Sequence, residues 1–261
     1  MHMGRCFGFA NSRVFIAHYT LPFSHIVFSG LILLPTVFSS TGLCDVKLPP
    51  FRDPQFPTIE KSTYEVNQKG KIHFSIHKIS RENFDGQFVY VISTDSQKMV
   101  VRADDLRPIL IEQRDDAGQQ KYSIEYYKHR AEQRVRFIYP GPKRNLVKEI
   151  REDSYDVNTI LEVIRGYPFN KEKVKFILVT TDHVVGVYAK IKAEQKVTTP
   201  LGIFDCYFIE SGVSGLKGKV IKTKYLFWVE KEHPYRIIKQ EDSKGENIIT
   251  LVKYEVLTDA R

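Results

Sequence analysis

Residues 156–169 read D-V-N-T-I-L-E-V-I-R-G-Y-P-F, and their apolar spacing is that of a helix. The apolar side chains at i, i+3, i+4 and i+7 are Val157, Ile160, Leu161 and Ile164. This period predicts a short amphipathic helix with one apolar stripe. An Asp or Ser within residues 153–156 is suited to cap its start, and Gly166 followed by Pro168 ends it.

On both sides of this helix the sequence is a succession of strand candidates. They span residues 71–79, 86–94, 97–103, 107–113, 121–128, 133–139, 145–152, 174–180, 184–196, 202–210, 219–230, 235–241 and 247–257. Short polar turns such as Asp85-Gly86 and residues 242–245 (DSKG) separate many of them. Turns of this kind favour tight reversals, so we expect an antiparallel meander.

The helix is too short to be stable alone, so its apolar stripe requires a surface to pack on. The concave face of a curved antiparallel sheet provides that surface. Residues 88–92 (FVYVI) and 176–179 (FILV) are apolar on both faces, as expected if the sheet wraps a core or a cavity. We therefore predict a mainly β fold, a single strongly curved antiparallel sheet (a half-barrel) with one short helix packed on the concave face.

The N-terminal segment differs sharply in composition from the rest. Residues 14–44 contain no Asp, Glu, Lys or Arg, and their most apolar part, residues 26–38, is 13 residues long. That length favours a cleaved secretory signal over an uncleaved membrane anchor, the alternative interpretation. A third interpretation is lipid attachment at Cys44, which Leu43 disfavours because a bacterial lipobox requires a small residue there. The predicted location is the periplasm, or the membrane if the segment is retained.

These features divide the chain into four predicted parts. They are a signal peptide or membrane segment (1–44), a Pro-rich linker (45–63), a β domain (64–257) and a C-terminal tail (258–261). Cys206 is the one cysteine inside the β domain, so no disulfide framework is available, and we expect it to be a small buried apolar residue. The chain has a net charge of +8, but its basic residues are interspersed with 31 acidic residues. This pattern does not indicate a nucleic-acid binder.

Four segments carry a family resemblance. They are T-T-P-L-G-I-F-D-C-Y-F (198–208), Y-L-F-W-V (225–229), H-P-Y-R (233–236) and the helical segment 156–169. Together they resemble the DUF3108 family of exported bacterial proteins, which is similar in fold to the lipoprotein carriers and receptors LolA and LolB. The resemblance covers roughly residues 64–254. It implies an architecture and a compartment, and since the family has no established activity it implies no catalytic residues.

The residues of these motifs are expected to serve folding first. Pro200 and Gly202 make a turn, Trp228 is a large buried apolar anchor, and Pro234 begins a strand. The functional alternative is that aromatic residues line a ligand cavity. These residues are Phe204, Phe208, Tyr225 and Trp228.

Metal, cofactor and enzyme signatures are weak in this sequence. His73 and His77 lie about 13 Å apart in an alternating strand, so we expect them to face solvent rather than bind zinc. Residues 212–219 have the spacing G-x5-G-K, and a strand rather than a helix follows, which disfavours a phosphate loop. Cys206 lies in a strand without an identifiable base. We expect no cofactor and no catalytic residue.

Three classes of function remain. The first is non-catalytic binding of a lipid, acyl chain or similar hydrophobic ligand by the helix stripe, with Lys171, Lys173 and Lys175 either contacting an anionic head group or forming a solvated strand face. The second is a structural or interaction module that joins an envelope assembly through a sheet edge. Enzymatic activity is the third. Membrane association is expected only through an uncleaved N-terminal segment.

Overall fold

The computed structural model describes residues 49–140, 145–181, 183–215, 218 and 222–257. All belong to one compact unit, Val46–Arg261. The predictions for residues 1–44, including Cys44, and for the tail 258–261 lie outside the described residues, as do residues 45–48 of the linker and 219–221 of one strand candidate. In the part of the chain that is described, no helix has the length and apolar character that a membrane crossing requires.

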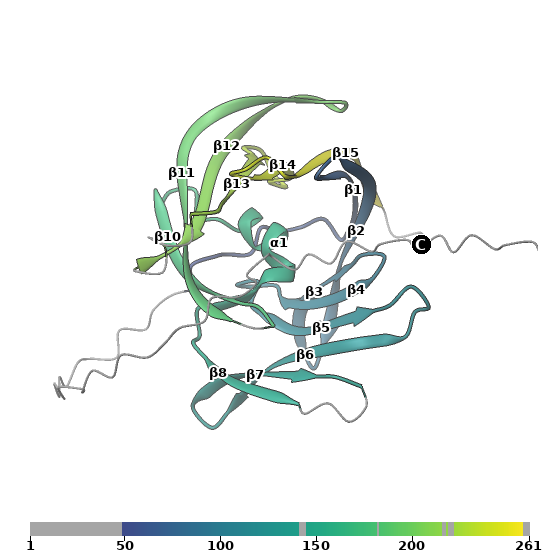
Figure 1. Ribbon diagram of the computed structural model, residues 1–261, viewed down its shortest axis with the longest axis vertical. Helices are drawn as coiled ribbons and strands as arrows, with labels where there is room; N and C mark the ends of the chain where they lie inside the picture. Colours follow the sequence, from purple (N-terminus) through teal and green to yellow (C-terminus); the bar gives the residue numbers. More distant parts are fainter. Residues whose placement is uncertain (1–48, 141–144, 182, 216–217, 219–221, 258–261) are drawn as a thin grey trace, which may run out of the picture. The chain divides into compact units, whose positions relative to one another are not determined.

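The described residues form a sheet of 15 strands (Figure 1). The strands of the first half are β1 (Ile59–Gln68), β2 (Lys71–Phe84), β3 (Gln87–Ser93), β4 (Gln97–Arg102), β5 (Pro108–Arg114), β6 (Gln120–His129), β7 (Glu132–Ile138) and β8 (Leu146–Ile150). Those of the second half are β9 (Ser154–Asp156), β10 (Lys173–Val179), β11 (Val184–Thr199), β12 (Gly202–Val213), β13 (Lys224–Glu230), β14 (Ile237–Asp242) and β15 (Asn247–Leu257). The 3₁₀ helix η1 (Val157–Thr159) and the helix α1 (Ile160–Arg165) lie between the two sets.

The order of the strands shows that the sheet nearly closes on itself. Strands β1 to β8 run as one meander and β9 to β15 as another, and the two join where β1 pairs with β15. The outermost strands, β8 and β9, are consecutive in the sequence, so the sheet is nearly closed as a barrel. All neighbouring strands are antiparallel except β9 and β10. Figure 1 shows α1 within the curve of these strands.

The predicted fold class is therefore confirmed, and strands β2 to β8 and β10 to β15 overlap the strand candidates from the sequence. Two strands, β1 and β9, are additional to the prediction. The expectation that Pro234 begins a strand is wrong, because β14 begins at Ile237. Pro234 instead lies in the preceding turn, where its carbonyl accepts hydrogen bonds from Arg165.

We call the face of the sheet that contacts α1 the inner face. Cross-strand register places one buried row along it, consisting of Glu60, Ile79, Ile92, Met99, Ile111, Ile124 and Phe137. The opposite, outer face of β3 is also buried, as its sequence predicts: Val89 and Val91 form an apolar cluster with Val100. The sheet thus buries apolar side chains on both sides of β3.

The Pro-rich segment before β1 enters the core. The ring of Phe51 is fully buried and lies edge-on against Tyr155 and Phe176, with centroids 5.1 and 4.9 Å away. The next residue, Arg52, donates its backbone N–H to the carbonyl of Gly166 at 2.9 Å. A Cβ on Gly166 would lie 2.3 Å from the Arg52 carbonyl oxygen, so glycine permits this close approach.

The helix forms where the sequence predicts it. Asp156 caps η1 by accepting a hydrogen bond from the backbone N–H of Asn158, and Gly166 is the C-cap of α1. Leu161 and Ile164 are buried, as the apolar stripe predicts, and so is Val163, which is not part of that stripe. Glu162 and Arg165 are buried as well, which the apolar stripe does not predict. The helix is therefore enclosed over most of its circumference rather than packed on one side.

Candidate functional site

The candidate site lies on the inner face of the sheet, at the start of the helix. Of the four predicted ligand-binding positions on the helical segment, Leu161 and Ile164 are buried, whereas Val157 and Ile160 are only half-buried. The apolar stripe thus has a filled end and an accessible end. The accessible end is next to Asp156, the capping residue.

Asp156 is the hub of a polar network at this end. It is fully buried and accepts hydrogen bonds from the Tyr126 hydroxyl and from the backbone and side-chain nitrogens of Asn158, the last two at 2.8 and 2.7 Å. The Asn158 side chain is in turn bonded to Gln97, and Gln97 donates to Gln113. Burial raises the pKa of Asp156 above its ordinary value, although these hydrogen bonds oppose the shift. The network fixes the start of the helix against β4, β5 and β6.

Three tyrosines surround this network, and we call them the tyrosine cluster: Tyr122, Tyr126 and Tyr139. Tyr122 and Tyr126 point to the same face of β6, and the rings of Tyr122 and Tyr139 lie 6.1 Å apart. All three are half-buried in the structure. Burial, Asp156 and Tyr139 raise the pKa of Tyr122 to about 12, and burial followed by Asp156 raises that of Tyr126 well above 10. These phenols stay protonated near neutral pH and can donate hydrogen bonds.

A second polar network surrounds the other end of the helix. Arg165 forms an ion pair with Glu60 of β1, and it also donates to the carbonyl oxygen of Pro234 at 3.0 Å. Tyr254 of β15 donates to Glu60 at 2.9 Å, and the Arg165 guanidinium lies 4.1 Å from the ring centroid of Phe56. These contacts tie the helix to both joined edges of the two meanders, β1 and β15. They are structural, since the charges are neutralised within the protein.

His77 corrects one sequence expectation. It was expected to face solvent, but it is buried, and its Nδ1 lies 3.1 Å from Oε1 of Glu162 on the helix. The other carboxylate oxygen of Glu162, Oε2, is buried and has no hydrogen-bond partner in the described structure. The ring of Tyr64 lies edge-on against His77 at 5.2 Å. In β2 the odd-numbered side chains point to the inner face, which places both His77 and Ile79 there.

The predicted aromatic site residues do not form one site with the helix. Phe208 and Trp228 are stacked with ring centroids 4.9 Å apart, but both point to the outer face, because their neighbours Ile209 and Phe227 occupy the inner one. Phe204, four residues before Phe208, also belongs to the outer face, where the Arg236 guanidinium lies 5.2 Å from its ring. Tyr225 alternates with Phe227 on the inner face, opposite Ser211 and Asp242.

The predicted head-group lysines are also separated from the helix. Lys171, Lys173 and Lys175 are exposed, and Lys173 and Lys175 point away from the inner face, on which Val174 and Phe176 are buried. Lys173 lies 4.6 Å from the ring centroid of Tyr188 on the neighbouring strand. Lys173 and Lys175 therefore line the outer surface of β10, and Lys171 precedes that strand.

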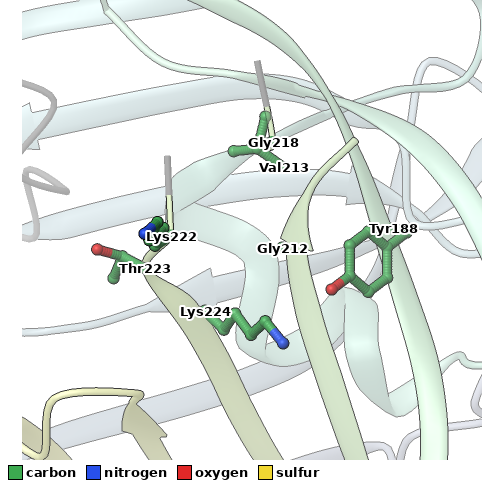
Figure 2. Close-up of a pocket in the computed structure, with 7 residues that line it drawn as sticks. All are labelled: Tyr188, Gly212, Val213, Gly218, Lys222, Thr223 and Lys224. Atoms are coloured by element: carbon green, nitrogen blue, oxygen red, sulfur yellow. The ribbon is translucent and has the colours of Figure 1, made fainter. Parts of the chain in front are cut away.

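The outer face has a cavity of about 280 Å³ between β11, β12 and the start of β13 (Figure 2). Its lining includes Tyr188, Gly212, Lys222 and Lys224. Lys224 and the Tyr188 hydroxyl both bind the carboxylate of Glu210, at 2.8 and 2.9 Å. Glu210 thus neutralises the charge of the partly exposed Lys224, which makes this cavity a weak anion site.

The reactive side chains of the described region do not make a catalytic arrangement. Cys206 is buried, as expected, and burial raises the pKa of its thiol to about 12, so the nucleophilic thiolate is scarce at neutral pH. Among the described residues, His, Cys, Asp and Glu side chains do not gather in groups of three that suit a metal ion.

Sequence reasoning found the helix stripe and its cap but missed the tyrosine cluster and the partners of Arg165. Tyr122 and Tyr139 meet only through the register of β6 and β7. Glu60 and Arg165 are 105 residues apart, so no local spacing relates them. Only the acidic and basic residues at positions 162 and 165, inside an apolar helix, indicated that charged partners would be needed in the core.

The comparisons with known proteins agree with the predicted family. The family model described as "Protein of unknown function (DUF3108)" matches residues 57–252. The comparison with curated proteins gave no match.

Three solved structures are among those that are similar to this chain. A β-barrel-like protein of the DUF1849 domain from Brucella abortus has a TM-score of 0.47 and 10% identity, over 77% of this chain and 98% of that one. A protein from Bacteroides fragilis, assigned as exported and with a YmcC-like fold, has a TM-score of 0.32 and 11% identity, over 79% and 99%. A domain from Vibrio parahaemolyticus, assigned to outer membrane lipoprotein sorting, has a TM-score of 0.27 and 12% identity, over 78% and 87%.

Proposed function

This chain belongs to the DUF3108 family of proteins of unknown function, and we propose that it is a non-catalytic binding protein for an amphipathic ligand with an acyl chain. The ligand lies on the inner face of the sheet beside the start of the helix. The observation that carries the proposal is the partial exposure of Val157 and Ile160, while the rest of the apolar stripe is buried.

The chemistry of the ligand follows from the groups around those two residues. An acyl chain packed on Val157 and Ile160 gains about 0.8 kcal/mol for each buried methylene, before the costs of association are subtracted. The neighbouring phenol of Tyr122 has a raised pKa and remains protonated, so it suits a head group that accepts hydrogen bonds, whereas the hydroxyl of Tyr126 already donates to Asp156. A carboxylate, phosphate or ester oxygen is such an acceptor.

The tyrosine cluster replaces the lysine series as the proposed head-group contact. Lys173 and Lys175 point to the outer face of β10, so they do not reach a ligand bound beside the helix. Phe208 and Trp228 are excluded from the proposed site for the same reason. The proposed site therefore combines Val157 and Ile160 with Tyr122, Tyr126 and Tyr139.

The proposed location is the cell envelope, most simply the periplasm. It rests on residues 14–44, which lack charged side chains as an export segment does. Acyl-chain ligands are abundant in that compartment. Intact-mass analysis of the protein from its host tests this part alone, because loss of the N-terminal segment indicates cleavage and a diacylglycerol mass on Cys44 indicates lipidation.

Binding is tested by titrating delipidated protein with palmitate and with a phospholipid, followed by calorimetry and thermal shift. Ile160→Asp is expected to weaken binding by roughly tenfold to hundredfold, since a buried isoleucine contributes about 1.5–3 kcal/mol. Val147→Asp is the matched control, because Val147 is exposed on nearby β8 but pairs with the exposed Arg136 of β7 on the outer face. Tyr122→Phe removes one hydroxyl and is expected to weaken binding of the head group without unfolding the protein.

Three results would contradict the proposal. One is the absence of saturable binding by the delipidated, folded protein. Another is equal loss of affinity in Ile160→Asp and Val147→Asp. A third is loss of affinity in Ile160→Asp only in proportion to loss of folded protein, measured by circular dichroism. The interaction-module alternative would then be favoured, and a different part of the sheet supports it.

A further inference from the structure

Strand β2 is paired on both sides only from Lys78 to Ser80, and before Lys78 it is paired on one side alone. It pairs with β1 from Lys71 to Ser80, whereas its pairing with β3 begins at Lys78. Within the described residues, 72–77 are therefore a sheet edge, although β2 lies in the middle of the strand order. Edges of this kind can accept a further strand.

The backbone of this edge has a definite orientation. Strands β1 and β2 are joined by Lys69 and Gly70, whose φ angles of 51° and 84° are both positive, as in a two-residue type I′ turn. Such a turn makes Gln68 and Lys71 a hydrogen-bonded pair. By alternation, the N–H and C=O groups of Ile72, Phe74 and Ile76 point away from β1 and toward the open side.

The same three residues present apolar side chains on the outer face. Ile72 and Phe74 are each 60% exposed, and Ile76 is partly exposed. Their neighbours on the inner face are His73 and Ser75, so the edge segment I-H-F-S-I has an apolar outer side and a polar inner side. An edge that is both open and apolar is unusual in a monomer, because it favours association.

We propose that this edge is a dimer interface, at which β2 of one copy pairs antiparallel with β2 of a second copy about Phe74. In this register Phe74 pairs with Phe74, Ile72 with Ile76, and His73 with Ser75. The backbone groups that point outward in one copy meet those of the other, as hydrogen-bonded pairs require. The two sheets become continuous across the two-fold axis.

A second copy fits this edge better than an unrelated peptide does, because the edge is complementary to itself. Only the register centred on Phe74 matches all three apolar residues with one another. Shifting it by two residues in one direction pairs Ile72 with Lys78, and in the other direction pairs Ile76 with Gly70. The centred register also avoids pairing two lysines, and like charges directly opposite each other are destabilising.

The dimer is expected to depend strongly on concentration. One strand pair and three apolar residues from each copy bury less surface than a typical stable interface of about 1,600 Å². The test must therefore detect weak association. Sedimentation velocity over a wide range of protein concentrations, with the protein purified from its host, meets this need.

Two phenylalanines provide a matched pair of variants. Phe74 is 60% exposed and Phe88 is 59% exposed, but Phe88 lies in β3, with its carbonyl bound to Ala103 on one side and Asn83 of β2 paired on the other. Phe74→Lys is expected to abolish the concentration-dependent increase in sedimentation coefficient, and Phe88→Lys to leave it unchanged. A wild-type protein that stays monomeric at every concentration contradicts the proposal, as does equal loss of dimer in both variants.

Covalent trapping provides an independent readout of register. Hydrogen-bonded antiparallel partners have Cα atoms about 5.5 Å apart, within the range that a disulfide spans. Under mild oxidation Phe74→Cys is expected to give a dimer linked from residue 74 to residue 74, identified by peptide mass spectrometry, and Phe88→Cys to give none. If Phe74→Cys is instead linked mainly to an unrelated protein in the envelope, the edge binds a foreign strand and the dimer proposal is wrong.

Discussion

Arg165 of α1 and Glu60 of β1 form an ion pair in which the side chains are only 3% and 1% exposed. The two residues join the helix to the strand where the two meanders meet. Removing one partner from a buried pair leaves the other charge unpaired, at a cost of about 3–5 kcal/mol. The pair is therefore expected to specify where the helix lies inside the sheet.

The first prediction concerns this pair. Arg165→Met is expected to lower the free energy of unfolding in urea by about 3–5 kcal/mol, whereas the double variant Arg165→Met/Glu60→Gln recovers a large part of the loss because no charge is left unpaired. The control is Glu255→Gln, which breaks the exposed pair with Lys253 and costs about 1 kcal/mol or less. Equal effects of Arg165→Met and Glu255→Gln would show that the buried pair has no special role.

The second prediction concerns Gly166. Its φ angle is not positive, so Gly166→Ala causes no backbone strain, but the new Cβ would lie 2.3 Å from the Arg52 carbonyl oxygen and 2.7 Å from Cδ1 of Leu106. We expect the segment before β1 to detach, with faster proteolysis near Phe51 and a loss of stability. Gly118→Ala is the control, because Gly118 has open space around it and a φ of 77°, so its cost is about 1 kcal/mol from strain alone. Unchanged proteolysis in Gly166→Ala would argue against the close approach.

The third prediction concerns Trp228, whose burial confirms the expectation from the sequence. Its indole N–H donates to Oε1 of Gln195 at 2.7 Å, and its ring stacks on Phe208. Trp228→Ala is expected to cost about 3–5 kcal/mol in unfolding experiments. Intrinsic emission should be that of a buried indole; an emission maximum typical of an indole in water would be incompatible with this packing.

The fourth prediction concerns pH. Burial raises the pKa of Asp156 above the ordinary 3.8, so the folded protein holds this proton more tightly than the unfolded chain does. The stability that Asp156 contributes through this linkage is fully present below 3.8 and is lost as pH rises through the raised pKa of the folded state. Asp156→Asn keeps a capping oxygen but cannot titrate. The difference in unfolding free energy, wild type minus variant, should therefore fall as pH rises through this window; a constant difference would contradict the raised pKa.

Much of the sheet could be predicted from the sequence, and the exceptions have physical causes. In β1 the inner positions are Glu60, Ser62, Tyr64 and Val66, so half of the buried row is polar and the alternation of apolar residues is lost. The polar members are tolerated because Arg165 and Tyr254 pair with Glu60, and those partners come from distant parts of the chain. The burial of Phe51 could not be predicted either, because a Pro-rich segment has no periodic pattern of apolar residues.

The candidate site was only partly predictable for a similar reason. The 3.6-residue period identified Val157, Ile160, Leu161 and Ile164, because a helix face is a local property. Which of the four remain accessible depends on how the sheet closes around them. The faces of Phe208 and Trp228 depend on which side of the sheet the helix occupies, and alternation alone does not determine that.

The central claim is that an acyl-chain ligand occupies the inner face beside Ile160. The most direct measurement is mass spectrometry of small molecules extracted from the protein purified out of its native envelope, with Ile160→Asp and Val147→Asp purified in parallel. The account predicts a lipid or fatty acid in stoichiometric amount with wild type and Val147→Asp, and much less with folded Ile160→Asp. Its absence from the wild-type protein, or equal amounts in all three preparations, would contradict the account.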